Sequence, residues 1–252
     1  MDDADLALLV DLHRHRQRQG PGGDAETAKA IALAGLSPSQ PLRIADIGCG
    51  TGASTLQLAR ALNARIAAVD FLPDFIAVLE ARAAAEGLSG RIEPLVASME
   101  ALPFADETFD VLWSEGAIYN MGFAKGVAAW RRFLKPGGLL AVSEITWLTG
   151  SRPAELQAHW EGEYPEIGPA SAKLKVLEDS GYAPVGYFVL PERCWLDNYY
   201  RPLCAQFDGF LERHCNSAAA ASIVEAEKNE VALYERFKAY YSYGVYLARR
   251  CG

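Results

Sequence analysis

Leu-Arg-Ile-Ala-Asp-Ile-Gly-Cys-Gly-Thr-Gly, residues 42–52, is the stretch that decides the fold. Its apolar first half predicts a short inner strand of a parallel sheet, covered on both faces. Gly48, Gly50 and Gly52 then alternate, and glycine permits positive φ and a close approach of a ligand to the backbone. A helix is expected from residue 53, and its first N–H groups would be free for a ligand. The stretch therefore predicts a strand, a ligand-binding loop and a helix.

Asp46 lies two residues before the first glycine, and its charge bears on the ligand. A carboxylate there would repel a pyrophosphate and would suit a cationic ligand. The dinucleotide pattern Gly-x-Gly-x-x-Gly/Ala can nevertheless be laid over Gly48, Gly50 and Ala53, so an NAD-dependent oxidoreductase is one alternative. A turn that only joins a strand to a helix is another.

An acidic residue followed by Gly-x-Gly-x-Gly resembles the first motif of the class I S-adenosylmethionine-dependent methyltransferases. Further motifs follow in the family's order over roughly residues 40–146. Asp70 ends the second expected strand, 65–69, where an acid meets ribose hydroxyls in a βαβ unit. Residues 97–104 resemble the family segment that contacts adenine, with Ser98 where an acid is usual. Leu-Lys-Pro-Gly-Gly at 134–138 is a further family hallmark.

The resemblance implies an α/β fold: a Rossmann-like, seven-stranded, mostly parallel sheet with helices on both faces, an N-terminal helical cap and a helical insertion before the last strand. We expect the cap at 1–40, the S-adenosylmethionine-binding core at 41–149, and the remaining strands with helical lid insertions at 150–252, in the same domain. The implied cofactor is S-adenosylmethionine. Its expected binding residues are Asp46, Gly48, Cys49, Gly50, Asp70, Phe71, Ser98, Met99 and Glu115.

Glu115 and Tyr119 follow the expected fourth strand, 109–114, and are the candidate catalytic residues. In open α/β sheets the chemistry lies beyond the strand ends, where the strand order changes. Methyl transfer depends mainly on holding the acceptor against the methyl carbon, and a base is needed only if the acceptor must first lose a proton. Glu115 would be a base or an acceptor-orienting group; alternatively, it holds the methionine moiety or a lid residue.

The acceptor is expected to be a small molecule, methylated on an O, N, S or C atom. An Asn-Pro-Pro-Tyr-type sequence, expected in methyltransferases that act on adenine N6 or a glutamine amide, is absent after the fourth strand. Segments near residues 115–130, 163–166 and 194–200 also resemble a bacterial subgroup of small-molecule methyltransferases. A non-catalytic protein that binds S-adenosylmethionine or S-adenosylhomocysteine would carry the same cofactor motifs, so it remains an alternative.

Two flanking regions are open to two interpretations each. The basic stretch 13–18 is either a solvated helix face or a segment that folds over the ligand site and pairs with a carboxylate. The aromatic region between strands 182–190 and 243–248 is either ordinary packing or a lid or oligomer contact. A homodimer through these C-terminal aromatic helices is therefore a further prediction.

The net charge of −8 argues against nucleic acid as the main partner, because phosphate binding needs clustered Lys and Arg. The apolar run 6–10 is too short for a signal peptide or a membrane span, so no membrane partner is expected. Five scattered cysteines without a Cys-x-x-Cys pair suggest reduced thiols and a cytoplasmic protein. No spacing of carboxylates and histidines predicts a metal site.

Overall fold

The computed structural model describes residues 3–252, so residues 1 and 2 of the expected cap lie outside the described residues. A central sheet has the strand order β3-β2-β1-β4-β5-β8-β7, and β6 pairs with β5 beside this path. The strands are β1 (Leu42–Ile47), β2 (Ala64–Asp70), β3 (Ile92–Val96), β4 (Phe109–Ser114), β5 (Leu134–Trp147), β6 (Gly168–Pro169), β7 (Tyr182–Val189) and β8 (Tyr241–Arg250).

The expected sheet of seven strands is confirmed, with the two-residue β6 as an addition. β1 pairs in parallel with β2 on one side and β4 on the other, so the strand order reverses beside β1. β8 is antiparallel to both β5 and β7. A crevice opens beyond the carboxyl ends of the strands at such a reversal, which is where ligands bind in open α/β sheets.

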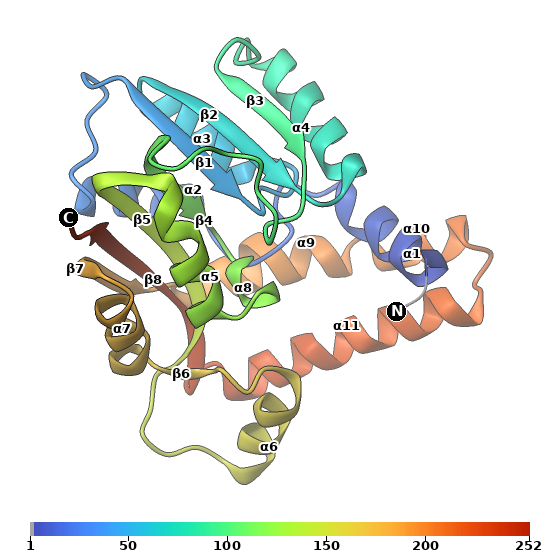
Figure 1. Ribbon diagram of the computed structural model, residues 1–252. Helices are drawn as coiled ribbons and strands as arrows, with labels where there is room; N and C mark the ends of the chain where they lie inside the picture. The colour runs from blue at the N-terminus through green and yellow to red at the C-terminus, as the bar shows by residue number, and fades with distance from the viewer. Residues whose placement is uncertain (1–2) are drawn as a thin grey trace.

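Helices cover both faces of the sheet (Figure 1). α2 (Asp24–Leu33), α3 (Ala53–Ala61) and α4 (Pro73–Ala85) lie on one face, and α5 (Phe123–Trp130) and α7 (Ala170–Asp179) on the other. α1 (Asp3–Arg14) and α6 (Ala154–Glu163) lie outside this layer, and short 3-10 turns occupy Ile118–Asn120 and Arg131–Phe133. The insertion before β8 comprises α8 (Glu192–Trp195), the π-helical turn Leu196–Tyr200, α9 (Arg201–Cys204), α10 (Phe207–Arg213) and α11 (Ala218–Phe237).

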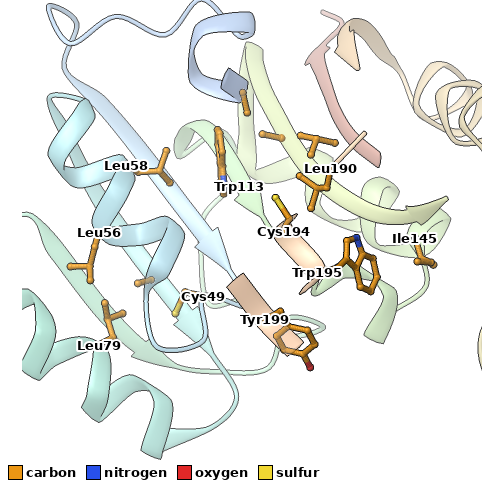
Figure 2. Close-up of a cluster of buried hydrophobic side chains, with 14 of the residues drawn as sticks. Cys49, Leu56, Leu58, Leu79, Trp113, Ile145, Leu190, Cys194, Trp195 and Tyr199 are labelled. Atoms are coloured by element: carbon orange, nitrogen blue, oxygen red, sulfur yellow. The ribbon is translucent and has the colours of Figure 1, made fainter. Parts of the chain in front are cut away.

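Two apolar clusters fill the space between the sheet and its helices. Figure 2 shows the larger one, in which Leu56 and Leu58 from α3 and Leu79 from α4 share a layer with Trp113 of β4. The cluster on the opposite face is centred on Phe123 and other α5 side chains. Each inner strand is therefore apolar on both faces, as residues 44–47 predicted.

The Leu-Lys-Pro-Gly-Gly segment forms the start of β5. The pairing of β4 with β5 shifts register between Phe109 and Val111, and Gly137 has a φ of +73°. The segment is thus an irregular first part of the strand. A glycine is needed there because the backbone enters the left-handed region.

The aromatic rings of the insertion pack inside the chain. Trp195 stacks on Tyr234 and Tyr243, with ring centroids 4.5 and 5.1 Å apart. Tyr200, Phe210 and Tyr234 are each at most 1 % exposed. Offset and edge-to-face contacts of this kind stabilise a core, so these rings serve ordinary packing of the extra helices.

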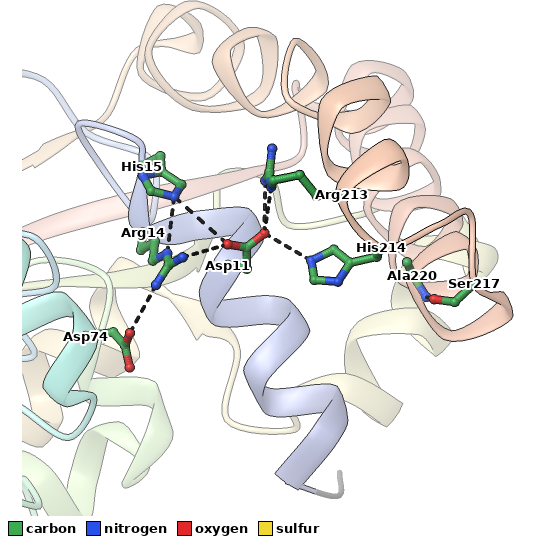
Figure 3. Close-up of polar contacts among 8 residues, drawn as sticks. All are labelled: Asp11, Arg14, His15, Asp74, Arg213, His214, Ser217 and Ala220. Carbon is green, nitrogen blue, oxygen red and sulfur yellow. Dashed lines mark hydrogen bonds and ion pairs between the residues drawn. The ribbon is translucent and has the colours of Figure 1, made fainter.

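The last turn of α1 is held by polar contacts to two neighbouring parts of the chain (Figure 3). Asp11 accepts hydrogen bonds from Arg213 at 2.9 Å and pairs with His214 at 3.1 Å, while Arg14 donates to Asp74 at 3.3 Å. Although burial raises the pKa of Asp11, these partners outweigh it and lower the pKa. The N-terminal helix is therefore held between α4 and the α10–α11 hairpin.

Candidate functional site

A cavity of about 690 Å³ lies at the carboxyl ends of β1, β2 and β4, beneath α1. This volume is within the usual range for small-molecule sites. Of the predicted site residues, those that line it are Gly48, Cys49, Gly50, Asp70, Phe71, Ser98, Met99, Glu115 and Tyr119. Asp46 is the predicted site residue that is not among the lining residues.

The glycine loop has the shape that its sequence demands. Gly48, Gly50 and Gly52 have φ of +73°, +55° and +87°. A Cβ on Gly48 would lie 2.3 Å from the Ala117 side chain, and one on Gly52 would lie 2.2 Å from Leu79. Both positions therefore exclude any larger residue for two reasons, backbone conformation and space.

The backbone amides of the loop are already hydrogen-bonded within the protein. The amides of residues 48 and 49 donate to Val69 O, and the amide of Gly52 donates to Cys49 O. Gly50 donates to Asp70 at 2.8 Å, and Thr51 to the Gln19 side chain at 3.0 Å. The free N–H groups predicted from the sequence were those at the start of the helix from residue 53, whereas the N–H groups of residues 48–52, ahead of that helix, are occupied. Residues 48–52 therefore offer no free amide to the pyrophosphate of a dinucleotide.

Asp46 lies behind the loop, fully buried. Its Oδ2 accepts hydrogen bonds from the hydroxyls of Ser54 at 2.8 Å and Thr55 at 2.6 Å, and Oδ1 has no partner among residues 3–252. Burial raises the pKa of Asp46 to about 7, although the two hydroxyls act in the opposite direction. In this structure the carboxyl group ties β1 to the first turn of α3.

Asp70 ends β2 at the floor of the cavity. Its Oδ2 accepts from Gly50 N at 2.8 Å and its Oδ1 from Leu72 N at 3.0 Å. Burial raises the pKa of Asp70 despite these backbone donors. Each carboxylate oxygen can accept a second hydrogen bond, so Asp70 both shapes the loop and keeps two acceptor positions for a vicinal diol.

The residues expected around the adenine ring of the cofactor lie next to Asp70 along the cavity wall. Phe71 lines the cavity and is 66 % exposed. Ser98 Oγ accepts from Glu100 N at 3.2 Å, which leaves its own proton free to donate. The Met99 carbonyl accepts from Trp130 Nε1 at 3.0 Å, which fixes the loop after β3. Cys49 is buried, and burial raises the pKa of its thiol, so it remains neutral.

Glu115 lies at the end of β4, where its carboxylate receives three donors. Arg18 donates to Oε2 at 3.0 Å; Thr27 Oγ1, at 2.7 Å, and Trp113 Nε1, at 3.0 Å, both donate to Oε1. Arg18 and Thr27 belong to the N-terminal cap. The carboxylate therefore holds the N-terminal cap to the end of β4.

Tyr119 follows in the 3-10 turn after β4 and is 42 % exposed. Its ring meets Tyr164 edge to face, with centroids 6.3 Å apart. Since Tyr119 also lines the cavity, it offers a ring and a hydroxyl to a bound molecule.

The basic stretch 13–18 folds over the site, so its interpretation as a solvated face is wrong. Arg16 is 6 % exposed, and the Arg18 side chain is 10 % exposed. Gln19, which sequence reasoning missed, accepts from Thr51 N and Oγ1, both at 3.0 Å, and so closes the glycine loop from above. Tyr199 and Glu227 of the insertion also line the cavity and were not predicted. Their sequence signal was weak because helical spacing does not show which face meets a ligand.

Two further findings concern the described part of the chain. Within residues 3–252, no cluster of three or more His, Cys, Asp or Glu side chains has an arrangement that could hold a metal ion. No helix in the same range combines the length and the apolar character that crossing a membrane requires.

The strand order, the antiparallel β8, the glycine loop and Asp70 together define the Rossmann-like fold of the class I methyltransferases. Comparison with known families agrees: residues 44–138 match the family profile described as "Methyltransferase domain". Residues 44–138 of this chain are thus similar to a methyltransferase domain.

Curated relatives match over the core region. The methyltransferase GfsG of Streptomyces halstedii is 32 % identical over 104 residues, which are 41 % of this chain and 37 % of GfsG. The ubiquinone/menaquinone biosynthesis C-methyltransferase UbiE of Geobacter sulfurreducens is 34 % identical over 107 residues, 41 % of this chain and 42 % of UbiE. The chain thus spans about two fifths of the length of these relatives.

Solved structures share the fold over nearly the whole chain. A methyltransferase from Geobacter sulfurreducens in complex with S-adenosyl-L-homocysteine has a TM-score of 0.82 and 18 % identity, and covers 98 % of both chains. The [4+2]-cyclase SpnF has a TM-score of 0.74 and 22 % identity, and covers 98 % of this chain and 93 % of its own. Since one neighbour is named as a cyclase, the fold by itself does not establish methyl transfer.

Proposed function

We propose that this protein is an enzyme that transfers the methyl group of S-adenosylmethionine to a small-molecule acceptor. The observation that carries the proposal is Asp70, whose carboxylate is fixed by Gly50 N and Leu72 N and keeps two acceptor positions facing the cavity. A ribose diol has the two donors that fit these positions. These acceptor positions thus suit a nucleoside, and the amides of residues 48–52 are not free for a pyrophosphate.

The remaining cofactor residues have complementary roles in the proposal. Ser98 donates its free hydroxyl proton to the adenine, and Phe71 and Met99 enclose the ring. Gly48 and Gly50 let the methionine portion approach the backbone, beside Cys49. Asp46 acts through its hold on Ser54 and Thr55, which keeps the loop in shape.

When bound, S-adenosylmethionine supplies an electrophilic methyl group on a sulfonium. The acceptor's lone pair bonds to the methyl carbon while the carbon–sulfur bond breaks and its electron pair returns to sulfur. The protein's own contribution is orientation and exclusion of water. Glu115 holds the cap closed through Arg18 and Thr27, and Tyr119 orients the acceptor from the end of β4.

A non-catalytic binding protein is the second candidate. It would use the same cofactor contacts, and the neighbour named as a cyclase indicates that this fold is not restricted to methyl transfer. The cavity wall beyond Glu115, formed by Tyr119, Tyr199 and residues of α1, supports an acceptor compartment and hence the enzyme. A nicotinamide-dependent oxidoreductase is disfavoured by the occupied loop amides.

We also propose that the protein is cytoplasmic. The support is that its five cysteines are free, as is usual in a reducing compartment. The homodimer suggested by the C-terminal aromatic helices stays a prediction. The rings on which it depended are buried within one chain, so they would not form its contact surface.

The test is isothermal titration of the purified protein with S-adenosylmethionine, S-adenosylhomocysteine and NAD in parallel. We expect dissociation constants of about micromolar magnitude for the first two and no heat for NAD. Absence of binding by both sulfur compounds would refute the proposal. Binding of NAD in their place would instead support the alternative that the protein is an NAD-dependent oxidoreductase.

A further inference from the structure

Glu227 of α11 is a carboxylate of the cavity wall that none of the cofactor roles uses. Its Oε1 lies 3.2 Å from His13 Nε2, and its Oε2 is buried without a hydrogen-bond partner among residues 3–252. The side chain is 13 % exposed. A carboxylate that has lost most of its water and has one hydrogen bond is under-satisfied, so it would gain from a donor carried by a ligand.

The contacts of His13 indicate which of its ring nitrogens donates. Arg16 Nη2 lies 2.7 Å from His13 Nδ1. Because a guanidinium is always a donor, Nδ1 must accept, and the proton of the neutral ring therefore lies on Nε2, where it is donated to Glu227. His13 thus orients the carboxylate.

The surrounding charges leave this end of the cavity negative. Arg16 lies over the Tyr199 ring, 4.6 Å from its centroid, and donates to Tyr199 O at 3.4 Å. Glu230, one turn after Glu227, accepts from Tyr200 OH at 2.9 Å. The carboxylates of Glu227 and Glu230 outnumber the Arg16 guanidinium at this end, although burial raises the pKa of Glu230. Arg18, the cation that lines the cavity, is already paired with Glu115 at 3.0 Å.

The other walls of this compartment are apolar or aromatic. Leu6, Leu9 and Val10 of α1 line it, as do Tyr119 and Tyr199. An aromatic face beside a carboxylate favours a cation, and the aliphatic side chains favour a carbon body. The cavity therefore has an anionic end, aromatic walls and an apolar strip.

We infer that the acceptor is a small amine that binds as a cation against Glu227, with an apolar body along Leu6, Leu9 and Val10. The inference rests on the proposed function, because it assigns the acceptor half of the same cavity. The proposed acceptor and S-adenosylmethionine both carry an ammonium group. The experiment must therefore distinguish an acceptor ammonium from the cofactor ammonium.

The test uses titration of the protein saturated with S-adenosylhomocysteine. The probes are phenethylamine, cyclohexylamine and n-butylamine, each compared with the alcohol and the carboxylate on the same carbon body. We expect at least one amine to bind at millimolar concentration or below, and about ten-fold more tightly than its alcohol and carboxylate counterparts. Equal or tighter binding of the alcohol or carboxylate, or no binding by any amine, would overturn the inference.

Glu227→Gln tests the residue assignment. We expect it to weaken amine binding about ten-fold, while the affinity for S-adenosylhomocysteine, which keeps its own ammonium, changes less than about two-fold. Glu225→Gln, on the same helix but exposed, is the matched control and should change neither affinity. If Glu227→Gln selectively lost affinity for S-adenosylhomocysteine, Glu227 would belong to the cofactor site and the inference would be overturned. Failure of the wild-type protein to bind S-adenosylhomocysteine would instead refute the proposed function.

Discussion

Replacing Asp70 with Asn probes the ribose contact with little change in side-chain shape. In the protein each carboxylate oxygen accepts one backbone N–H, from Gly50 at 2.8 Å and from Leu72 at 3.0 Å. An amide has one oxygen, so its NH₂ group must face one of these N–H donors in either orientation. The variant therefore loses one backbone acceptor and one of the two acceptor positions proposed for the ribose diol.

The size of the effect follows from the loss of a hydrogen bond to a charged group. Such a bond contributes about 1.5–3 kcal/mol, which corresponds to about a ten- to hundred-fold weaker binding of S-adenosylhomocysteine. The assay is isothermal titration, with thermal unfolding to verify that the variant folds. Asp179→Asn is the matched control, because that carboxylate pairs with Lys175 on the exposed face of α7, far from the cavity wall. An Asp70→Asn protein that is folded and binds S-adenosylhomocysteine with unchanged affinity would refute the ribose assignment.

Three further perturbations address the cap, the core and the glycine loop. Glu115→Gln removes the charge that pairs with Arg18, so we expect faster amide hydrogen exchange in residues 16–23 and lower turnover; unchanged exchange would contradict the cap-holding role. Lys173→Met leaves Glu144 buried without its cation, so urea unfolding at neutral pH should show a loss of about 3–5 kcal/mol. Burial raises the pKa of Glu144, so this loss should shrink in mildly acidic buffer, and a loss independent of pH would refute the reasoning. Burial also raises the pKa of Asp46 from 3.8 to about 7, so the ligand-free protein should lose stability as the pH rises across that interval, by up to about 4 kcal/mol, and Asp46→Asn should flatten the slope.

Local sequence signals predicted the sheet well because its strands and turns carry strong physical constraints. The run 42–47 is buried on both faces, and the glycines after it have the positive φ that their spacing suggested. Asp70 was predicted to contact the ribose from its place after the second strand, and in the structure it ends β2 and lines the cavity, while the ribose contact stays a prediction. These features depend on neighbours within one βαβ unit.

The features that were missed depend on contacts between distant parts of the chain. Arg18 meets Glu115 across 97 positions, and His13 meets Glu227 across 214. No local periodicity encodes such pairs, so the basic stretch could not be distinguished from a solvated helix face. The aromatic insertion shows the same limit, because composition predicts large rings but not that Trp195 stacks within its own chain.

For Asp46, the role that the family motif suggested differs from the contacts that the side chain makes in the structure. The motif suggested a carboxylate facing a cationic ligand, whereas the structure directs Oδ2 to the hydroxyls of Ser54 and Thr55. Both hydroxyls are in the first turn of α3, and a carboxylate that receives them stabilises the turn that shapes the loop. An acid before the glycines thus also has a structural reason in this chain.

The most direct test of the central claim is a crystal structure of the protein with S-adenosylhomocysteine. The account predicts both ribose hydroxyls within about 3 Å of the Asp70 carboxylate, the adenine beside Ser98 and Met99, and the sulfur atom facing the compartment of Tyr119 and Glu227. Density for the ligand outside this cavity, or a ribose that does not contact Asp70, would contradict it.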